Sequence, residues 1–248
     1  MSRFIKKSNL PEGKVVSLIC GTDDKSILDF LNQNGIEIFK NEANPFIDSA
    51  VSHHSDMTAV YVGEGKVLID KNQTKLKEML CEIGCDIIET EMAVMGEYPD
   101  DIKLNFAVTG DCIIGNFPFA DSKLLELTED FKKLHVKQGY SKCSTLIVNE
   151  NALITDDVSI CRKASENGFD CLFVSKGDVC LKGHNYGFIG GASGKISNDT
   201  VVFFGDISIH RDFEKIREFL TKHNCKFVCT DNLQLRDIGG IIPLKEIT

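Results

Sequence analysis

Three residues that suit metal chemistry lie close together in the chain. His53, His54 and Asp56 form a His-His-x-Asp cluster, and imidazole nitrogens and carboxylate oxygens are common ligands of divalent metals. The same spacing is typical of a polar loop that leads into a strand, and we favour that interpretation. The sequence therefore predicts no metal and no cofactor.

The chain also has ten cysteines, which are its candidate nucleophiles. Without a secretory segment they are expected to be free thiols rather than disulfides. Cys112 and Cys143 fall near the ends of predicted strands that would line the centre of the fold. Either thiol could attack a substrate if a nearby cation or histidine lowered its pKa. The alternative is that each is a small buried hydrophobic residue.

Two further polar residues have a structural and a chemical interpretation. His135 follows a predicted helix over residues 122–134, where a histidine can interact favourably with the helix dipole or transfer protons in catalysis. Asp111 follows Gly110, and an aspartate in such a turn commonly accepts hydrogen bonds from its own backbone. Both interpretations stay open at this point.

Composition excludes some classes of function. The chain has 248 residues and a formal net charge of −9, so it lacks the basic field that nucleic-acid binding requires. It contains no apolar run of the roughly 18 residues that a membrane helix needs. Its first 14 residues lack the apolar segment of a signal peptide. We expect a cytoplasmic protein that binds neither nucleic acid nor a membrane.

A recurring pattern dominates the rest of the chain. Residues 58–70 and 144–156 align without a gap, and each segment is an apolar run, a polar turn and a second apolar run. A helix is predicted after each, over residues 74–83 and 159–167, and a short strand follows. Units of this kind must pack against copies of themselves. The copies span residues 53–90, 104–140, 143–175 and 186–230.

The two ends of the chain complement each other. A fifth copy begins at residue 235 and ends before its helix. Residues 14–40 read as strand, helix over 23–34, and strand, which would complete that copy. The sequence thus predicts an α/β fold, a single domain over residues 1–248, in which five strand-strand-helix-strand units form a ring without free sheet edges. An open doubly wound sheet is the alternative, but it lacks the recurring hairpins.

A five-unit ring of this kind resembles the pentein, or guanidino-group-modifying-enzyme, fold, a five-fold α/β propeller. Residues 135–147 are similar to the His-Leu-Lys segment of dimethylarginine dimethylaminohydrolases, which implies His135 as general acid/base and Lys137 as a ligand contact. Residues 109–114 occupy the place of an acidic turn, which implies a catalytic role for Asp111. Residues 55–60 occupy the place of a segment whose aspartate holds the guanidinium, which implies ligand binding by Asp56 and its neighbour His54.

Residues 136–144 and 186–194 resemble an uncharacterised bacterial family with this fold, and the resemblance extends from about residue 50 onward. The catalytic positions of the enzymes are not all kept. Val108 stands at the acidic position before Gly110, and Pro243 stands where the enzymes have their nucleophilic cysteine. No cysteine follows Cys229. The resemblance therefore implies the fold without the usual nucleophile.

Three functions follow from these observations. The first is the binding of a small polar, guanidino or amidino ligand in an axial pocket without covalent turnover. The second is a hydrolase or amidino-modifying enzyme with a relocated nucleophile, Cys143 or Cys112, and His135 as acid/base. The third is a non-catalytic module that binds another macromolecule. The oligomeric state is left open.

Overall fold

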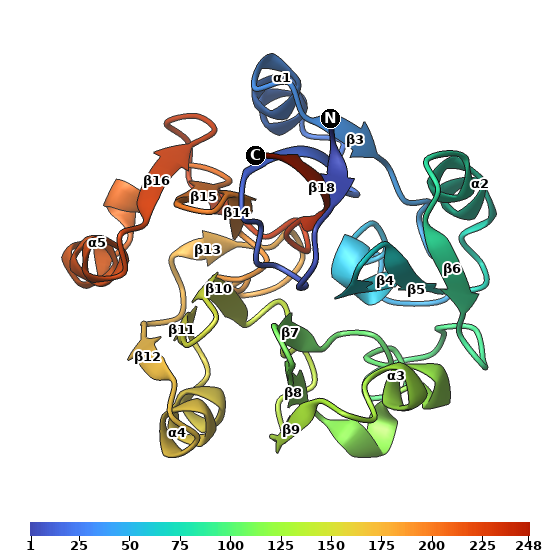
Figure 1. Cartoon of the computed structure of the whole chain (residues 1–248). Coiled ribbons are helices and arrows are strands. Elements are labelled where there is room, and N and C mark those ends of the chain that lie inside the picture. The colour runs from blue at the N-terminus through green and yellow to red at the C-terminus, as the bar shows by residue number, and fades with distance from the viewer.

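A computed structural model describes all residues, 1–248, and shows an α/β fold with five α-helices. In Figure 1 the helices lie on the outside and the strands lie between them and the centre. The helices are α1 (Lys25–Gln33), α2 (Thr74–Glu82), α3 (Ser122–Leu127), α4 (Val158–Glu166) and α5 (Phe213–Lys222).

Three small sheets share one pattern of strand pairing. In each sheet the first two strands form an antiparallel hairpin, and a helix then leads to a third strand that pairs in parallel with the second. The sheets are β4 (Ala59–Gly63), β5 (Lys66–Ile69) and β6 (Asp86–Glu89); β7 (Ala107–Thr109), β8 (Cys112–Gly115) and β9 (Lys132–His135); and β10 (Thr145–Asn149), β11 (Ala152–Thr155) and β12 (Asp170–Phe173).

A further sheet has seven strands. Its strands are β1 (Arg3–Phe4), β2 (Lys14–Ile19), β3 (Glu37–Phe39), β14 (Ser193–Ser197), β15 (Thr200–Phe203), β16 (Lys226–Cys229) and β18 (Ile242–Ile247). The C-terminal β18 pairs antiparallel with β2, and β2 pairs in parallel with β3 across α1. The two ends of the chain therefore meet in one sheet. A single β-bridge, between Ser197 and Lys14, joins β2 to β14.

Local sequence explains the helix boundaries. Asp24 and Asp157 accept hydrogen bonds from the first backbone N–H groups of α1 and α4, which stabilises a helix start. Gly84 follows α2 with a φ of 86°, a conformation that glycine adopts without strain. Each long helix buries one apolar stripe against the sheets; Ile27 and Leu31 do so in α1. The helices are held by packing more than by their own propensity.

The helix predicted over residues 122–134 is wrong in length. α3 ends at Leu127, and residues 132–135 form β9, which pairs in parallel with β8. Thr128 caps α3, since its backbone N–H and its hydroxyl both donate to the carbonyl of Leu124, and residues 132–135 pair with β8 instead of continuing the helix. His135 is consequently the last residue of a strand rather than a helix cap.

Two short strands, β13 (Val179–Cys180) and β17 (Leu235–Arg236), pair in parallel and bring the chain after residue 180 close to the C-terminal segment.

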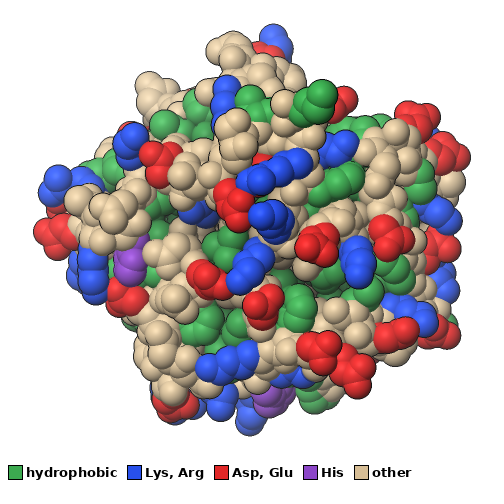
Figure 2. All heavy atoms as spheres, in the orientation of Figure 1, with side chains coloured by type: hydrophobic (Ala, Val, Ile, Leu, Met, Phe, Trp, Pro, Cys, Tyr) green, Lys and Arg blue, Asp and Glu red, His purple; other side chains and the backbone are tan.

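None of the helices combines the length and the apolar composition that crossing a membrane requires. Charged side chains of both signs are mixed over the face shown in Figure 2. Exposed ion pairs of the chain include Lys7 with Glu150 and Arg3 with Glu12.

Candidate active site

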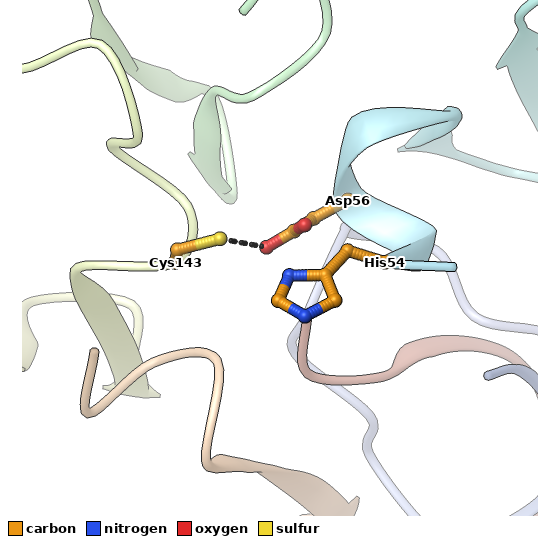
Figure 3. Close-up of side chains that lie close together, drawn as sticks. All are labelled: His54, Asp56 and Cys143. Atoms are coloured by element: carbon orange, nitrogen blue, oxygen red, sulfur yellow. Dashed lines mark hydrogen bonds between the residues drawn. The ribbon is translucent and has the colours of Figure 1, made fainter. Parts of the chain in front are cut away.

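Three buried side chains with reactive groups converge near the centre of the molecule. The Cys143 thiol donates to Asp56 Oδ2 over 2.8 Å. One ligand atom each of His54, Asp56 and Cys143 lies within 4.8 Å of the other two. Figure 3 shows the three side chains pointing toward one another from two different segments of the chain. The structure therefore brings a thiol, a carboxylate and an imidazole into one buried cluster.

The segments that carry these residues have equivalent places in the fold. Asp56 belongs to a 3₁₀ turn, Ser55–Met57, directly before β4, and Cys143 lies in the turn directly before β10. In the gap-free alignment of the two hairpins, Met57 takes the place of Cys143. In both units, the residues just before the first strand of the hairpin therefore lie near the centre of the molecule.

The amide of Asn105 holds the two segments together. Its Oδ1 accepts from the backbone N–H groups of Lys142 and Cys143, over 2.9 and 3.3 Å. Its Nδ2 donates to Cys143 Sγ over 3.3 Å and to Met57 Sδ over 3.2 Å. Asn105 is fully buried, so each of these bonds is made away from water and fixes the thiol.

Asp237 supplies a second carboxylate beside the cluster. Its Oδ1 lies 3.7 Å from His54 Nδ1 and accepts from the N–H of Gly239. Its Oδ2 accepts from the N–H of Phe188 over 2.9 Å. A Cβ atom at Gly191 would lie 1.9 Å from the Asp237 carboxylate, so only glycine allows this close approach.

A pocket of about 260 Å³ leads from the surface to this cluster. Cys143 and Asp237 are part of its wall, and His184 and Asp48 are exposed residues of the same wall that contact each other over 3.1 Å. Its aromatic residues are Tyr140, Tyr186 and Phe188. The pocket combines apolar walls with a few polar groups, as small-molecule sites commonly do.

Burial sets the ionisation of the site. It raises the pKa of Asp56 to about 6, against the opposing effects of His54 and Lys142. Burial, followed by the charges of Asp56 and Asp237, raises the pKa of the Cys143 thiol well above its ordinary value. The thiol is therefore protonated at neutral pH, and it becomes a nucleophile only when a positive charge enters its surroundings.

The raised pKa of Asp156 makes the stability of the protein depend on pH. Burial raises its pKa from 3.8 to about 7, so the unfolded chain loses this proton at lower pH than the folded protein. Stability from this group is present below pH 3.8 and is lost as pH rises toward 7. We expect Asp156→Asn to gain about 2–3 kcal/mol relative to wild type between pH 5 and pH 8.

Urea denaturation of both proteins at each pH measures this difference. Carboxyl groups with lowered pKa values, such as Asp178 at about 2, are ionised in both states over this range. Burial lowers the pKa of His210, so this group makes stability rise with pH. Its effect is the same in wild type and in Asp156→Asn, and it cancels in the difference between them. Parallel stability curves for the two proteins would show that Asp156 keeps an ordinary pKa.

The other residues proposed from the sequence lie elsewhere. His135 and Lys137 are exposed and border a surface hollow with Arg162 and Lys163 of α4. His135 ends the outer strand of its sheet and faces the ring of Phe117. The structure therefore does not pair His135 with Cys143.

Asp111 and Cys112 are also outside the cluster. Asp111 lies in the β7–β8 turn, is largely exposed and approaches Lys7 over 3.5 Å. Cys112 is buried among apolar side chains, and burial raises its pKa to about 11. Neither position brings a reactive group to the buried cluster, which leaves Cys143, Asp56 and His54 from the predicted set; of these, Cys143 lines the pocket.

Sequence reasoning missed Asn105, Asp237 and Asp156. A usable signal existed for two of them. Asp156 aligns with Asp70, and both are buried directly after a hairpin. Asp237 directly precedes a glycine-rich stretch of otherwise apolar residues, where a charged side chain is costly unless it has hydrogen-bonding partners. Asn105 has no such signal.

Comparisons with known proteins agree with this geometry at the level of the fold. An inosamine-phosphate amidinotransferase from Streptomyces griseus superimposes with a TM-score of 0.63 and 9% identity, over 98% of this chain and 97% of that chain. An agmatine deiminase from C. jejuni gives 0.55 and 13%, over 93% and 91%. A dimethylarginine dimethylaminohydrolase gives 0.56 and 10%, over 88% and 92%. No curated protein matches the sequence.

The structural likeness confirms the resemblance to pentein-fold proteins, at identities that show the fold alone. A family model also matches the sequence itself, over residues 18–242. That range includes His54, Asp56, Cys143 and Asp237. The chain belongs to this family, described as a family of unknown function, DUF6873.

Proposed function

We propose that the pocket binds a small ligand with a guanidinium or amidinium group. The observation that carries the proposal is a buried carboxylate with a free acceptor. Asp56 is 1% exposed and its Oδ1 has no hydrogen-bonding partner. A buried acceptor without a partner is costly, and a planar cation with several N–H donors would satisfy it.

The charges around the cluster favour a cation. Asp56, Asp156 and Asp237 are buried, and Asp156 Oδ1 is likewise without a partner. Lys142 is a buried cationic side chain whose charge acts on Asp56. Three carboxylates outnumber it, so a cationic ligand would offset their mutual repulsion. Guanidinium groups match carboxylates well, because their paired N–H groups can donate to both oxygens.

The similar structures support the same ligand class. Their names describe transfer of amidino groups and deimination of agmatine. These activities belong to those proteins, and the likeness to this chain is one of fold. What the present chain adds is its own acidic, thiol-containing pocket in the centre of that fold.

A second candidate is covalent amidino chemistry at Cys143, because this thiol lines the pocket beside a histidine and carboxylates. In this reaction the thiol proton passes to Asp56, a C–S bond forms to the amidino carbon, and the C–N bond to the leaving amine breaks. The amine leaves with a proton from His54. Water then attacks the same carbon and gives one proton to His54. As the C–S bond breaks, Asp56 returns its proton to the Cys143 sulfur, the carbonyl of the ureido product forms, and the second proton of the water leaves with the released amine as an ammonium ion.

This candidate changes the roles expected from the sequence. The acid/base is His54, because His135 lies in a different hollow. A bound guanidinium would also lower the raised pKa of the Cys143 thiol, since its positive charge stabilises the thiolate. The thiol would then be reactive only with the ligand in place.

Calorimetric titration with arginine, methylarginines and agmatine tests the proposal. We expect at least one of these cations to bind, and citrulline, which replaces the guanidinium with a neutral ureido group, to bind at least about 10-fold more weakly. Asp56→Asn should weaken cation binding, whereas Asp29→Asn on an exposed helix face should leave it unchanged. Absence of binding by every cation would refute the proposal.

Product analysis in the same mixtures separates the two candidates. Release of ammonia or an amine that stops in Cys143→Ser would support covalent chemistry. Binding without any product would support a binding protein. Turnover that survives Cys143→Ser but is lost in a His135 variant would contradict the role that we give to His54.

We further propose that the five strand-strand-helix-strand units form one closed ring and a single domain over residues 1–248. Support comes from the pairing of β18 with β2, which joins the two ends of the chain. We also propose a cytoplasmic location, because all ten cysteines are free thiols and such thiols persist in a reducing compartment.

A further inference from the structure

We propose that His54, Asp56 and Cys143 bind a single Zn²⁺ ion. The three residues supply an imidazole nitrogen, a carboxylate oxygen and a sulfur, which are the ligand types that zinc prefers. Their ligand atoms lie within 4.8 Å of one another, and all three residues are buried. The inference goes beyond the proposed ligand and does not depend on it.

The distances are close to those of a zinc site. Zinc bonds of about 2.0–2.3 Å place neighbouring ligand atoms about 3.5 Å apart. The widest separations, of up to 4.8 Å, therefore need to shrink by about one ångström, and the 2.8 Å between Cys143 Sγ and Asp56 Oδ2 needs to widen by less than that. Rotations about the χ angles can provide both changes. Cys143 Sγ and Asp56 Oδ2 are already 2.8 Å apart, so binding would replace the proton between them.

A second, independent observation points to a ligand here. His54 Nδ1 and Asp56 Oδ1 are both buried without a hydrogen-bonding partner. Such atoms are uncommon in folded proteins and call for an explanation. Figure 3 shows the His54 ring turned with one nitrogen toward the other two side chains. A metal ion between the three groups would bind His54 Nδ1, and a carboxylate that binds through both oxygens would use Asp56 Oδ1 as well.

The charges balance when the thiol gives up its proton. A thiolate at Cys143 and a carboxylate at Asp56 carry two negative charges, which Zn²⁺ neutralises, while His54 binds as neutral imidazole. Asp237 Oδ1 lies 3.7 Å from His54 Nδ1 and adds negative potential beside the ion. A neutral cluster is far less costly to bury than an isolated cation.

The site would keep one position open. The chain supplies three ligands, and Cys143 lines the pocket, so the fourth position of a tetrahedral ion faces the pocket. Three protein ligands and one exchangeable position are typical of zinc sites that stay accessible to small molecules. The ion would also compete with a cationic ligand for Asp56 and make the Cys143 thiol inaccessible to alkylation.

The sequence pointed to only part of this site, His54 and Asp56, and the interpretation favoured there was a polar loop without a metal. His53, the neighbour that completes the His-His-x-Asp spacing, is exposed on the surface. The sulfur ligand comes from 87 residues further along the chain than Asp56. Only the fold places the cysteine beside the histidine and the aspartate.

Cobalt titration of the full-length, reduced protein, freed of metal by a chelator, tests the inference. Co²⁺ adopts zinc-like coordination and gives a thiolate-to-metal charge-transfer band that reports a cysteine ligand. We expect this band to saturate at one Co²⁺ per chain and to disappear when Zn²⁺ is added. Zn²⁺ should also slow alkylation of Cys143 by iodoacetamide, as peptide mass spectrometry measures for each cysteine.

Matched variants locate the ion. Cys143→Ala should abolish the band, whereas Cys112→Ala, which removes another buried thiol, should keep it. Asp56→Asn has nearly the shape of the native side chain and should lower affinity by more than the roughly 10–100-fold that loss of an outer-sphere partner costs. Circular dichroism and thermal melts establish that each variant is folded. A band that persists in Cys143→Ala, or no band in wild type, would overturn the inference.

The ligand titrations separate this inference from the proposed function, since they are run with chelator present. Cation binding without a cobalt band would refute the zinc site alone. A cobalt band lost in Cys143→Ala, with no cation bound, would refute the guanidinium pocket alone.

Discussion

Asp237→Ala should greatly weaken binding of a guanidinium ligand and lower the free energy of unfolding. The carboxylate accepts from the N–H groups of Phe188 and Gly239 over 2.9 and 3.0 Å. Removing it leaves two backbone donors without partners, at a cost of about 2–4 kcal/mol in total. Loss of a carboxylate that contacts a cation should weaken ligand binding about 100-fold. Calorimetry and urea denaturation measure the two effects.

A milder substitution, Asp237→Asn, separates the effect on ligand binding from the effect on stability. In Asp237→Asn the side-chain oxygen still accepts from one N–H group, so stability should fall by less than in Asp237→Ala while cation binding stays weak. Asp29→Ala, at an exposed position in α1, should change unfolding by no more than about 0.5 kcal/mol. Undiminished cation binding by Asp237→Asn would mean that this carboxylate does not contact the ligand.

Phe203→Ala should cost about 3–5 kcal/mol of stability, because it leaves a cavity in the core. Phe203 is the last residue of β15 and is fully buried. Its ring meets that of Phe227 edge-on, with the centroids 6.2 Å apart. It belongs to the apolar cluster that also contains Ile216 and Leu220 of α5. Chemical denaturation of wild type and variant gives the difference.

Phe173 provides a matched control. It is the last residue of β12, as Phe203 is of β15, but 46% of its surface is exposed. Phe173→Ala should therefore cost well under half as much as Phe203→Ala. Similar losses for the two variants would show that packing around Phe203 is loose and relaxes into the cavity.

The local pattern of the sequence predicted much of the fold. The helices predicted over residues 23–34, 74–83 and 159–167 form as α1, α2 and α4, with ends within about two residues of the predicted bounds. A short strand follows α2 and α4, as predicted. Periodicity could do this because each element buries one apolar face. It failed at residues 128–135, where the polar and charged sequence matches helix and strand equally well and only pairing with β8 decides between them.

The site was predicted less completely than the fold. Asp56, His54 and Cys143 were chosen from the sequence, and the structure places them together. His135 and Asp111 were chosen from short motifs and lie away from the pocket. A motif fixes the order of residues along a strand, but the face on which a side chain lies depends on the register of the whole sheet.

The sequence by itself determined the α/β class, the recurring hairpins and the complementary ends of the chain, because these depend on local apolar periodicity. Only the tertiary structure decided which polar groups meet. Asn105, Cys143 and Asp237 come from three separate segments, and they converge because the entries to the first strands and the C-terminal segment all face the same centre. That convergence buries the carboxylates, raises the pKa values of Asp56 and Cys143, and creates the acidic pocket that no single stretch of sequence contains.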